Sequence, residues 1–388
     1  MFSSPVKTAI VGLGTIGSVH AELCASSVTS KVTVVCDTSS NRAQAVAAAT
    51  GSDWEVDYRR VLERRDVDAV IIATPTHLHA PVAIEALEAG KSVGIEKPLA
   101  RNVAEGQEIV AAAERTGLHA QYFENLCFSP AYRQAKTLVE AGALGDIFYV
   151  RCCENSGGGA SMGVGAYQSI EHQVTTSGSS DEPLGTWFSD PDRSGGGMII
   201  STACHCITYV YHVLDRRAPI RVYAETLSRN SADPRVEDAG YLMVRFAGDV
   251  VSHIESSAIN ALGTFDDRAE IYGTEGSILL NLYRSAAIKV YSQPGYSPDL
   301  GASLFGNYDR ATTNWSYPIP DERHSLGYAA ELHEFFHAIR EDRPPDVTLT
   351  DGLVTLSVIA AAYESARTAH SVAAVRTSPP TGAGLGSL

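Results

Sequence analysis

A glycine-rich turn near the N-terminus has the residue types and spacing that bind a dinucleotide. The turn reads Gly12-Leu13-Gly14-Thr15-Ile16-Gly17; it follows an apolar segment, residues 7–11, and opens a helical pattern. Gly12 would allow the tight turn, Gly14 the close approach of a pyrophosphate, and Gly17 the packing of the helix on the strand. The helix N-terminus, with Thr15 and Ile16 in its first turn, would then face the phosphates.

An acidic residue should follow on the second strand, where it binds the ribose hydroxyls. Asp37 stands there, at the end of the predicted strand 32–36 and 25 residues after Gly12. A carboxylate at this point would repel a 2′-phosphate, so the sequence favours NAD over NADP. Arg42 is near enough in the sequence to keep NADP open as the alternative.

Two further polar stretches end predicted strands. Thr74-Pro75-Thr76-His77-Leu78-His79 ends a strand of the buried type over 69–73, and Glu96-Lys97-Pro98 ends a strand over 92–95. Ligands bind at the carboxyl ends of the strands in open parallel sheets. A lysine and a glutamate side by side at such an edge suit proton handling near a nicotinamide ring.

The elements that must position these residues alternate between strand and helix over the first 125 residues. This alternation predicts a parallel, doubly wound sheet, so residues 1–126 are expected to form a Rossmann domain. Residues 221–290 carry period-two strands with little helix, which predicts an antiparallel or mixed sheet. The fold class is therefore α/β, with a second α/β domain over 127–372 and a flexible tail over 373–388. Glycine clusters at 157–159 and 195–197 predict active-site loops.

Composition and charge exclude several function classes. The 388 residues carry 30 Lys and Arg against 45 Asp and Glu, and a net charge of −15 offers no footprint for nucleic acid or an anionic membrane. The longest uncharged run, 194–214, holds three glycines and two histidines and predicts a buried helix rather than a membrane span. Seven cysteines at irregular spacings are typical of a reducing compartment, so a cytoplasmic location is expected.

The chain resembles the Gfo/Idh/MocA oxidoreductase family, which includes glucose–fructose oxidoreductase and inositol dehydrogenase. The matching text is GLGTIG, then ATPTHLHAPVAIEALEAGKSVGIEKPLA, then EIYGTEGSI, and the likeness runs from about residue 8 to about residue 372. The resemblance implies a Rossmann domain and a C-terminal α/β domain whose large open, mostly antiparallel sheet packs in dimers or tetramers. It also implies reversible hydride transfer between NAD(P) and a secondary alcohol of a sugar or cyclitol.

Under this resemblance, functional positions carry over residue by residue. Lys97 matches the catalytic lysine, which contacts the reacting hydroxyl and helps to move its proton. Asn125 matches a position beside the nicotinamide and the substrate, and Glu124 is a less favoured candidate there. Tyr167 and Trp187 lie in loops that should frame the substrate; a core anchor is the open alternative for Trp187. The matched residues that shape the cofactor site are Glu96, Pro98, Thr74, Pro75 and His79.

The catalytic histidine of the family lies in a GGGxxxDxGxHxxD pattern, from which this chain departs. His205 matches the histidine, but Ser201 and Thr208 replace the two aspartates. A continuous α-helix would place Ser201 and His205 on one face, where Ser201 could meet the substrate. The missing carboxylate would have raised the proton affinity of the histidine. Lys97 and His205 are therefore expected to move the proton alone, or with a substitute from the loops: Asp190, Glu171 or His172. The alternative for His205 is an interior histidine without a catalytic role.

Two patterns that suggest metal chemistry are set aside. His333-Glu334-Phe335-Phe336-His337 matches HExxH, which on a helix can bind zinc with the glutamate as base. A zinc peptidase needs a third ligand, and the resemblance places an amphipathic helix here instead. Cys204-His205-Cys206 lacks CxxC spacing. The sequence therefore predicts no metal site.

These observations predict an NAD-dependent oxidoreductase that acts on a secondary alcohol of a sugar, glycoside or cyclitol. A homodimer or homotetramer is expected, without nucleic acid or membrane as partner. One open alternative is a lyase or glycosidase that uses bound NAD in a transient oxidation, elimination and reduction. The other is a non-catalytic NAD-binding sensor or partner subunit, which the two missing aspartates favour and the intact Lys97 and His205 disfavour.

Overall fold

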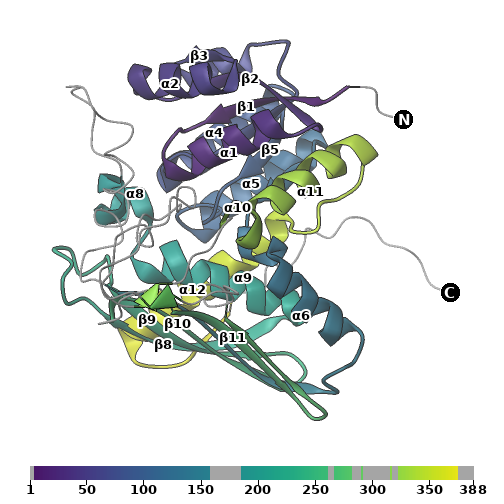
Figure 1. Ribbon diagram of the computed structural model, residues 1–388. Coiled ribbons are helices and arrows are strands. Elements are labelled where there is room, and N and C mark those ends of the chain that lie inside the picture. The colour runs from purple at the N-terminus through teal and green to yellow at the C-terminus, as the bar shows by residue number, and fades with distance from the viewer. Residues whose placement is uncertain are drawn as a thin grey trace, which may run out of the picture.

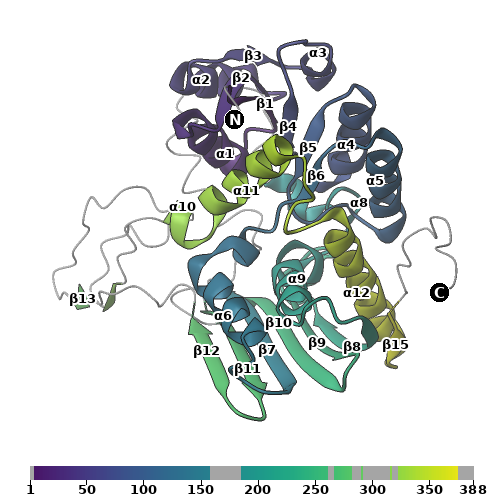
Figure 2. The same ribbon diagram turned by 90° about the vertical axis from the view of Figure 1, so that its right-hand side faces the viewer.

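Two sheets organise the chain in the computed structural model (Figures 1 and 2). The structure describes residues 4–157, 185–260, 266–281, 290–291, 315–316 and 322–374. The N-terminal sheet and its helices form one half of the molecule, and the second sheet lies at the opposite end beneath its own layer of helices. None of the helices in these ranges is long and apolar enough to cross a membrane.

Six parallel strands in the order β3-β2-β1-β4-β5-β6 form the N-terminal sheet, which is the doubly wound order of a dinucleotide-binding fold. The strands are β1 Val6–Val11, β2 Ser30–Cys36, β3 Asp53–Glu55, β4 Ala69–Ile72, β5 Ser92–Ile95 and β6 Ala120–Tyr122. The helices are α1 Thr15–Ser26, α2 Ser40–Thr50, α3 Tyr58–Leu62, η1 Thr76–Leu78, α4 His79–Glu88 and α5 Val103–Thr116. The predicted parallel sheet is thus confirmed; the short elements β3, α3 and β6 were not anticipated.

Local signals explain where these elements begin and end. The Asn102 side chain accepts the Glu105 N–H at the start of α5, and Gly117 ends that helix in the left-handed conformation. β4 is apolar and buried along its whole length, as a central strand with helices on both faces must be. The carboxyl ends of β1, β4 and β5 therefore meet at one edge of the sheet.

The second sheet is mixed and mostly antiparallel. Its order is β12-β11-β7-β10-β9-β8-β15, and only β7 and β10 pair in parallel. The strands are β7 Ile147–Gly157, β8 Pro219–Leu227, β9 Ala239–Phe246, β10 Val250–Asn260, β11 Asp266–Gly273, β12 Ser277–Asn281 and β15 Val372–Ala373. The end of the region predicted to carry period-two strands, 221–290, does not join this sheet: Val290–Tyr291 (β13) pairs with Trp315–Ser316 (β14).

Three helices from separate parts of the chain cover one face of this sheet (Figure 2). They are α6 Pro130–Glu140, α9 Cys204–Val213 and α12 Leu349–Thr368. Shorter turns are η2 Asn125–Phe128, η3 Thr186–Ser189, α8 Pro191–Ser194, η4 Ile199–Ala203 and α10 Glu322–Ser325. Along one register row, buried side chains of five strands face the helices: Ala224, Leu242, Ile254, Cys152 and Ala269.

The helix α11, Tyr328–Glu341, returns to the N-terminal sheet (Figure 2). Its residues Leu332, Phe335 and Phe336 are buried in one cluster with Ile10 of β1 and Ile71 of β4. A helix from the far end of the sequence therefore completes the core of the N-terminal half, and it carries any polar residue on its inner face into that core.

Candidate active site

A cavity of about 420 Å³ runs along the carboxyl edge of the N-terminal sheet. Its wall contains ten of the predicted cofactor-site residues: Gly12, Gly14, Thr15, Ile16, Asp37, Thr74, Pro75, Glu96, Lys97 and Pro98. Trp187 and Ser201 from the later part of the chain line the same cavity. One space therefore joins the glycine turn to the Glu96-Lys97 strand end and to two predicted substrate residues.

The glycine turn needs glycine at two of its positions. Gly12 has φ +89°, and a Cβ there would lie 2.5 Å from the Ala73 carbonyl oxygen. A Cβ on Gly17 would lie 1.8 Å from the Gly12 carbonyl oxygen, so this glycine permits α1 to pack against the turn. Gly17 itself stays behind the cavity wall, in the packing role that its spacing predicts.

The residues of the turn fit a dinucleotide. Gly14 caps α1 without a side-chain hydrogen bond, so no side chain blocks the helix N-terminus. Thr15 and Thr74 line the cavity, and their hydroxyl oxygens are buried without a hydrogen-bond partner in the described part of the chain. Orphaned buried groups of this kind fit the pyrophosphate and ribose oxygens of a bound NAD(P).

Asp37 is fixed by three donors at the far end of the cavity. Its carboxylate accepts the Leu13 N–H and the Ser39 N–H, each at 2.8 Å, and Arg42 Nη2 lies 3.0 Å away. Arg42 also lines the cavity. The acidic residue thus stands where ribose recognition requires it, with a guanidinium directly beside it.

Lys97 connects the two halves of the chain. Its Nζ donates to the Ser201 carbonyl oxygen at 2.9 Å, which brings the strand end to the segment that leads into α9. Behind it, Glu96 accepts the Lys97 N–H at 3.0 Å and pairs with His20 Nε2 at 2.7 Å. Burial would raise the pKa of Glu96, but His20 and Lys97 outweigh burial and lower the pKa below its ordinary value.

Two predicted contact residues lie outside the cavity wall. His79 is buried, with Nδ1 2.8 Å from the Pro98 carbonyl oxygen and Nε2 2.9 Å from that of Thr74. It ties the two strand-end loops together rather than facing the cavity. Asn125 is also buried, and its Nδ2 donates to the Leu326 carbonyl oxygen at 2.8 Å.

His205 has a carboxylate partner that the sequence did not assign to it. Its Nδ1 lies 2.5 Å from Glu124 Oε1, and both side chains are buried. Glu124 follows β6 by two residues, so it occupies the same sheet edge as Lys97. The strand-end signal that pointed to Lys97 would have pointed here too, had β6 been recognised.

Of the proposed substitutes for the missing aspartates, Asp190 does not take this place. It caps α8 by accepting the Asp192 N–H at 2.9 Å. Glu171, His172 and the predicted substrate residue Tyr167 lie outside the described residues. Thr208 faces the interior, where its hydroxyl is 2.8 Å from that of Thr355.

The segment before His205 is not a continuous α-helix. Ile199–Ala203 (η4) forms a π-helical turn, and α9 begins only at Cys204. A π turn holds more residues per turn than an α turn. The expected continuous α-helix through Ser201 and His205 is therefore wrong. Ser201 instead presents its carbonyl oxygen to Lys97, while its hydroxyl donates to the Gly197 carbonyl oxygen at 2.7 Å.

A further carboxyl group, Glu154 of β7, stands beside both bases. Burial raises its pKa, the charges of His205 and Lys97 oppose that rise, and the Glu124 charge adds to it. Its Oε2 is buried without a hydrogen-bond partner in the described ranges. No pattern in the sequence marks Glu154, because its position depends on how β7 passes beneath α9.

Trp187 lines the cavity and stacks on Phe188, with ring centroids 3.7 Å apart. The core-anchor alternative for this tryptophan is not supported, because the cavity reaches its side chain. In the HExxH segment, Glu334 pairs with Arg343 at 2.6 Å, so its carboxylate is engaged as a structural ion pair. The His333 and His337 rings stack on each other, with centroids 4.1 Å apart.

Comparisons with known proteins agree with this geometry. Residues 6–123 match the model of an oxidoreductase family with an NAD-binding Rossmann fold, and residues 132–279 match the GFO/IDH/MocA C-terminal domain. The chain is 28% identical over 368 residues to scyllo-inositol 2-dehydrogenase (NAD(+)) of Bacillus subtilis (strain 168), which covers 93% of this chain and 94% of that protein. It is 28% identical over 340 residues to levoglucosan dehydrogenase of Pseudarthrobacter phenanthrenivorans, with 80% of each chain covered.

Among solved structures, GenD2 from gentamicin A biosynthesis, in complex with NAD, has a TM-score of 0.83 at 23% identity and covers 96% of this chain and 97% of its own. Levoglucosan dehydrogenase in complex with NADH and levoglucosan has a TM-score of 0.75 at 24% identity, with 95% and 99% covered. These likenesses show the fold over nearly the whole chain. With both halves matched by the same family in sequence, this chain belongs to the GFO/IDH/MocA oxidoreductase family.

Proposed function

We propose that this protein is an NAD-dependent dehydrogenase of a secondary alcohol on a cyclitol, sugar or glycoside. The observation that carries the proposal is the single cavity that leads from the glycine turn and Asp37 to Lys97, with the His205–Glu124 pair behind Ser201. The names of the two relatives, an inositol and a levoglucosan dehydrogenase, support the substrate class.

The residues at the Lys97 end have complementary roles in alcohol oxidation. Bound NAD supplies a hydride acceptor. Glu124 holds the proton of His205 on Nδ1, which leaves Nε2 as the base for the substrate hydroxyl proton. The Lys97 ammonium, held by the Ser201 carbonyl oxygen, stabilises the negative charge that develops on the substrate oxygen. In the reverse direction the same two groups return the proton to a carbonyl oxygen.

The preference for NAD over NADP is part of the proposal. The Asp37 carboxylate, anchored by the Leu13 and Ser39 N–H groups, supports binding to the two ribose hydroxyls and disfavours a 2′-phosphate. Arg42 neutralises part of this charge, so we expect a moderate preference rather than exclusion. The ratio of kcat/KM with NAD to that with NADP tests it; a ratio below one contradicts it.

The decisive experiment measures NADH formation in the near ultraviolet with NAD and a panel of inositols, sugars and glycosides. Lys97→Ala should lower kcat by about 10²–10³-fold, because it removes the positioned charge that stabilises the substrate oxygen as it becomes negative. Lys31→Ala, at an exposed lysine of β2, is the matched control and should keep wild-type turnover.

Two results would contradict the proposal. A substrate that changes by mass spectrometry without net NADH would identify the transient-oxidation lyase instead. NAD binding without turnover of any alcohol in the panel would favour the sensor interpretation.

A further inference from the structure

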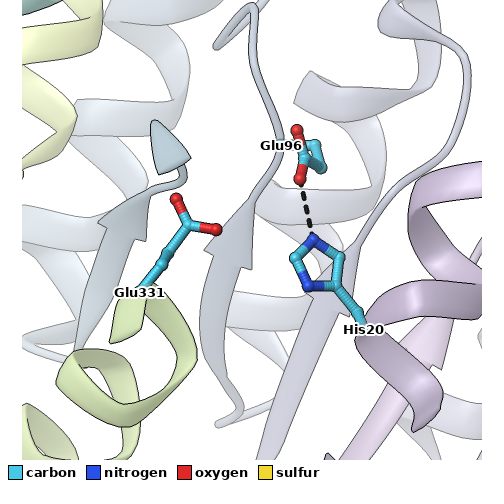
Figure 3. A group of neighbouring side chains, drawn as sticks. All are labelled: His20, Glu96 and Glu331. Atoms are coloured by element: carbon cyan, nitrogen blue, oxygen red, sulfur yellow. Dashed lines mark hydrogen bonds and ion pairs between the residues drawn. The ribbon is translucent and has the colours of Figure 1, made fainter. Parts of the chain in front are cut away.

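Three buried titratable side chains meet behind Lys97, and one of them, Glu96, also lines the cavity (Figure 3). They are His20 of α1, Glu96 after β5 and Glu331 of α11, and one potential ligand atom from each lies within 4.8 Å of the other two. Figure 3 shows the Glu331 carboxyl group pointing towards the His20–Glu96 pair from the opposite side. α11 thus brings an acidic group from the end of the chain against the support of the proposed catalytic lysine.

The two carboxyl groups of this cluster differ in their hydrogen bonding. Glu96 accepts from His20 and from the Lys97 N–H, so both of its oxygens are engaged. Glu331 is 0% exposed, and neither of its oxygens has a hydrogen-bond partner in the described segments. An ionised carboxylate buried in this way is far more costly than the neutral acid.

The charges around Glu331 also disfavour its ionisation. Burial first, and then the charges of Glu96 and Glu124, raise the pKa of Glu331 well above its ordinary value; the Glu124 backbone opposes the rise. The elements packed against α11 carry His20, Glu22 and Cys24 on α1, Cys127 in η2, and Arg323 and His324 on α10, and the neighbouring strand ends carry Glu96, Lys97 and Glu124. Of these cations, Lys97 is directed at Ser201 and Arg323 pairs with Glu22.

A metal ion is the other group that this donor set could hold. The donors, however, bind one another rather than a common centre: His20 Nε2 and Glu96 Oε1 are 2.7 Å apart, and the second Glu96 oxygen takes the Lys97 N–H. A cation bound by His20 Nε2 would have to break the His20–Glu96 contact. A proton on Glu331 leaves this contact in place.

We propose that Glu331 is a neutral carboxylic acid in the working protein and acts as a positioning residue behind both proposed catalytic residues, Lys97 and His205. Its proton lets Glu96 remain ionised beside Lys97 and lets Glu124 remain ionised beside His205, because a third buried negative charge between them would repel both. When Glu331 ionises at alkaline pH, both pairs are disturbed together. The protonation state of Glu331 is inferred from its burial, its lack of hydrogen-bond partners in the described segments and the charges around it. Its effect on turnover rests on the proposed function.

Infrared difference spectroscopy tests the protonation state without any substrate. At neutral pH, wild type minus Glu331→Gln should contain one C=O stretch of a protonated carboxyl group, sensitive to deuterium exchange. Glu334→Gln is the matched control: Glu334 lies one turn further along α11 and pairs with Arg343, so its loss should remove only a carboxylate band. If the amide is not tolerated, Glu331→Met serves as the neutral variant.

Folding equilibria give a second readout. Above pH 4.5 the unfolded chain releases the Glu331 proton while the folded chain keeps it, so this residue makes folding less favourable as pH rises. The folding constant of Glu331→Gln relative to wild type should therefore rise by about tenfold per pH unit until Glu331 ionises in the folded state. Glu334→Gln should lack this slope.

Turnover is the third readout. The alkaline fall of kcat should shift to higher pH in Glu331→Gln, with KM for NAD unchanged. Absence of the protonated-carboxyl band, or a stoichiometric divalent metal in the purified protein that Glu331→Gln loses, would overturn the proposal. If the protein oxidises no alcohol, the infrared and folding results still decide the state of Glu331, so the two proposals fail separately.

Discussion

At the scale of single residues, His205 depends on Glu124 to act as the base of the proposed mechanism. The Nδ1–Oε1 contact of 2.5 Å fixes the imidazole ring and directs Nε2 away from the carboxylate. In the pattern that this chain resembles, an aspartate one turn away on the same helix stands near the histidine. Here the carboxylate comes from the end of β6, and residue 201 contacts Lys97 through its backbone carbonyl oxygen.

Glu124→Gln should lower kcat by about 10²–10⁴-fold, because an amide can present its N–H₂ group to Nδ1 and favour the wrong tautomer. Affinity for NAD should stay the same, since Glu124 lies outside the cavity wall. Steady-state kinetics and NAD titration measure the two effects. Asp190→Asn is the control: its carboxylate caps α8, so turnover should remain close to wild type. Equal losses in both variants would contradict a specific role for Glu124.

Sequence reasoning reached the residues whose signal is local. Lys97 and Asp37 stand directly after apolar strands, and the glycine turn carries its own spacing. Glu124 is separated from His205 by 81 residues, so its pairing depends on how α9 packs against the end of β6. Glu154 depends on the path of β7 in the same way.

At the scale of elements, the π-helical turn η4 decides where α9 points. Glu237, just before β9, accepts the Gly197 N–H at 2.9 Å and the Ile199 N–H at 2.7 Å, and it also takes the Tyr363 hydroxyl at 3.1 Å. A Cβ on Gly197 would lie 2.1 Å from the Glu237 carbonyl oxygen. The glycine run predicted a turn, but the π turn could not be predicted, because its anchor lies 40 residues further along the chain.

Glu237, which binds the backbone at the start of η4, and His212, near the end of α9, should give opposite pH dependences of stability. Burial raises the pKa of Glu237 to about 7. The folded state therefore holds a proton that the unfolded state has lost between pH 4.5 and 7, and stability falls as pH rises. Burial, with the charges of Lys136 and Arg216, lowers the pKa of His212 to about 4. Between pH 4 and 6.5 the unfolded state binds the extra proton, so stability rises with pH.

Removing one group should expose the other. Relative to wild type, Glu237→Gln should gain stability as pH rises from 4.5 to 7, and His212→Gln should lose it from 4 to 6.5, by up to about 3 kcal/mol each. Urea unfolding across this range measures both slopes. Slopes of the same sign in the two variants would contradict the assignment.

At the scale of the whole molecule, the two sheets do not correspond to two independent cores. Residues 1–126 hold all six strands of the N-terminal sheet, yet α11 supplies Leu332, Phe335 and Phe336 to its core. A boundary placed at residue 126 from the change in pattern follows the sheets but misses this return. The resemblance implied an amphipathic helix at 333–337, but which sheet this helix covers depends on tertiary packing. That packing brings Glu331 behind Lys97.

The outer face of the seven-stranded sheet carries exposed apolar side chains that should form a homo-oligomer interface. One register row across six strands has side chains on the face opposite the helices: Tyr223, Met243, His253, Arg151, Glu270 and Leu279. Leu279 is 71% exposed and Met243 is 42% exposed, with the polar side chains of three strands between them. Exposed apolar side chains rimmed by polar residues are typical of protein–protein contacts.

We expect the wild-type protein to be a dimer or tetramer in light scattering coupled to size exclusion. Burying the exposed apolar side chains of this face between subunits is favourable, because it removes them from water. Met243→Glu combined with Leu279→Glu should lower the mass by at least half, since each introduced charge would be buried without a partner in the interface. Val28→Glu, at an apolar side chain that is 92% exposed on the N-terminal half, is the matched control. Circular dichroism should show that both variants keep their fold. A wild-type monomer, or an equal loss of mass in the Val28 variant, would contradict assembly through this sheet.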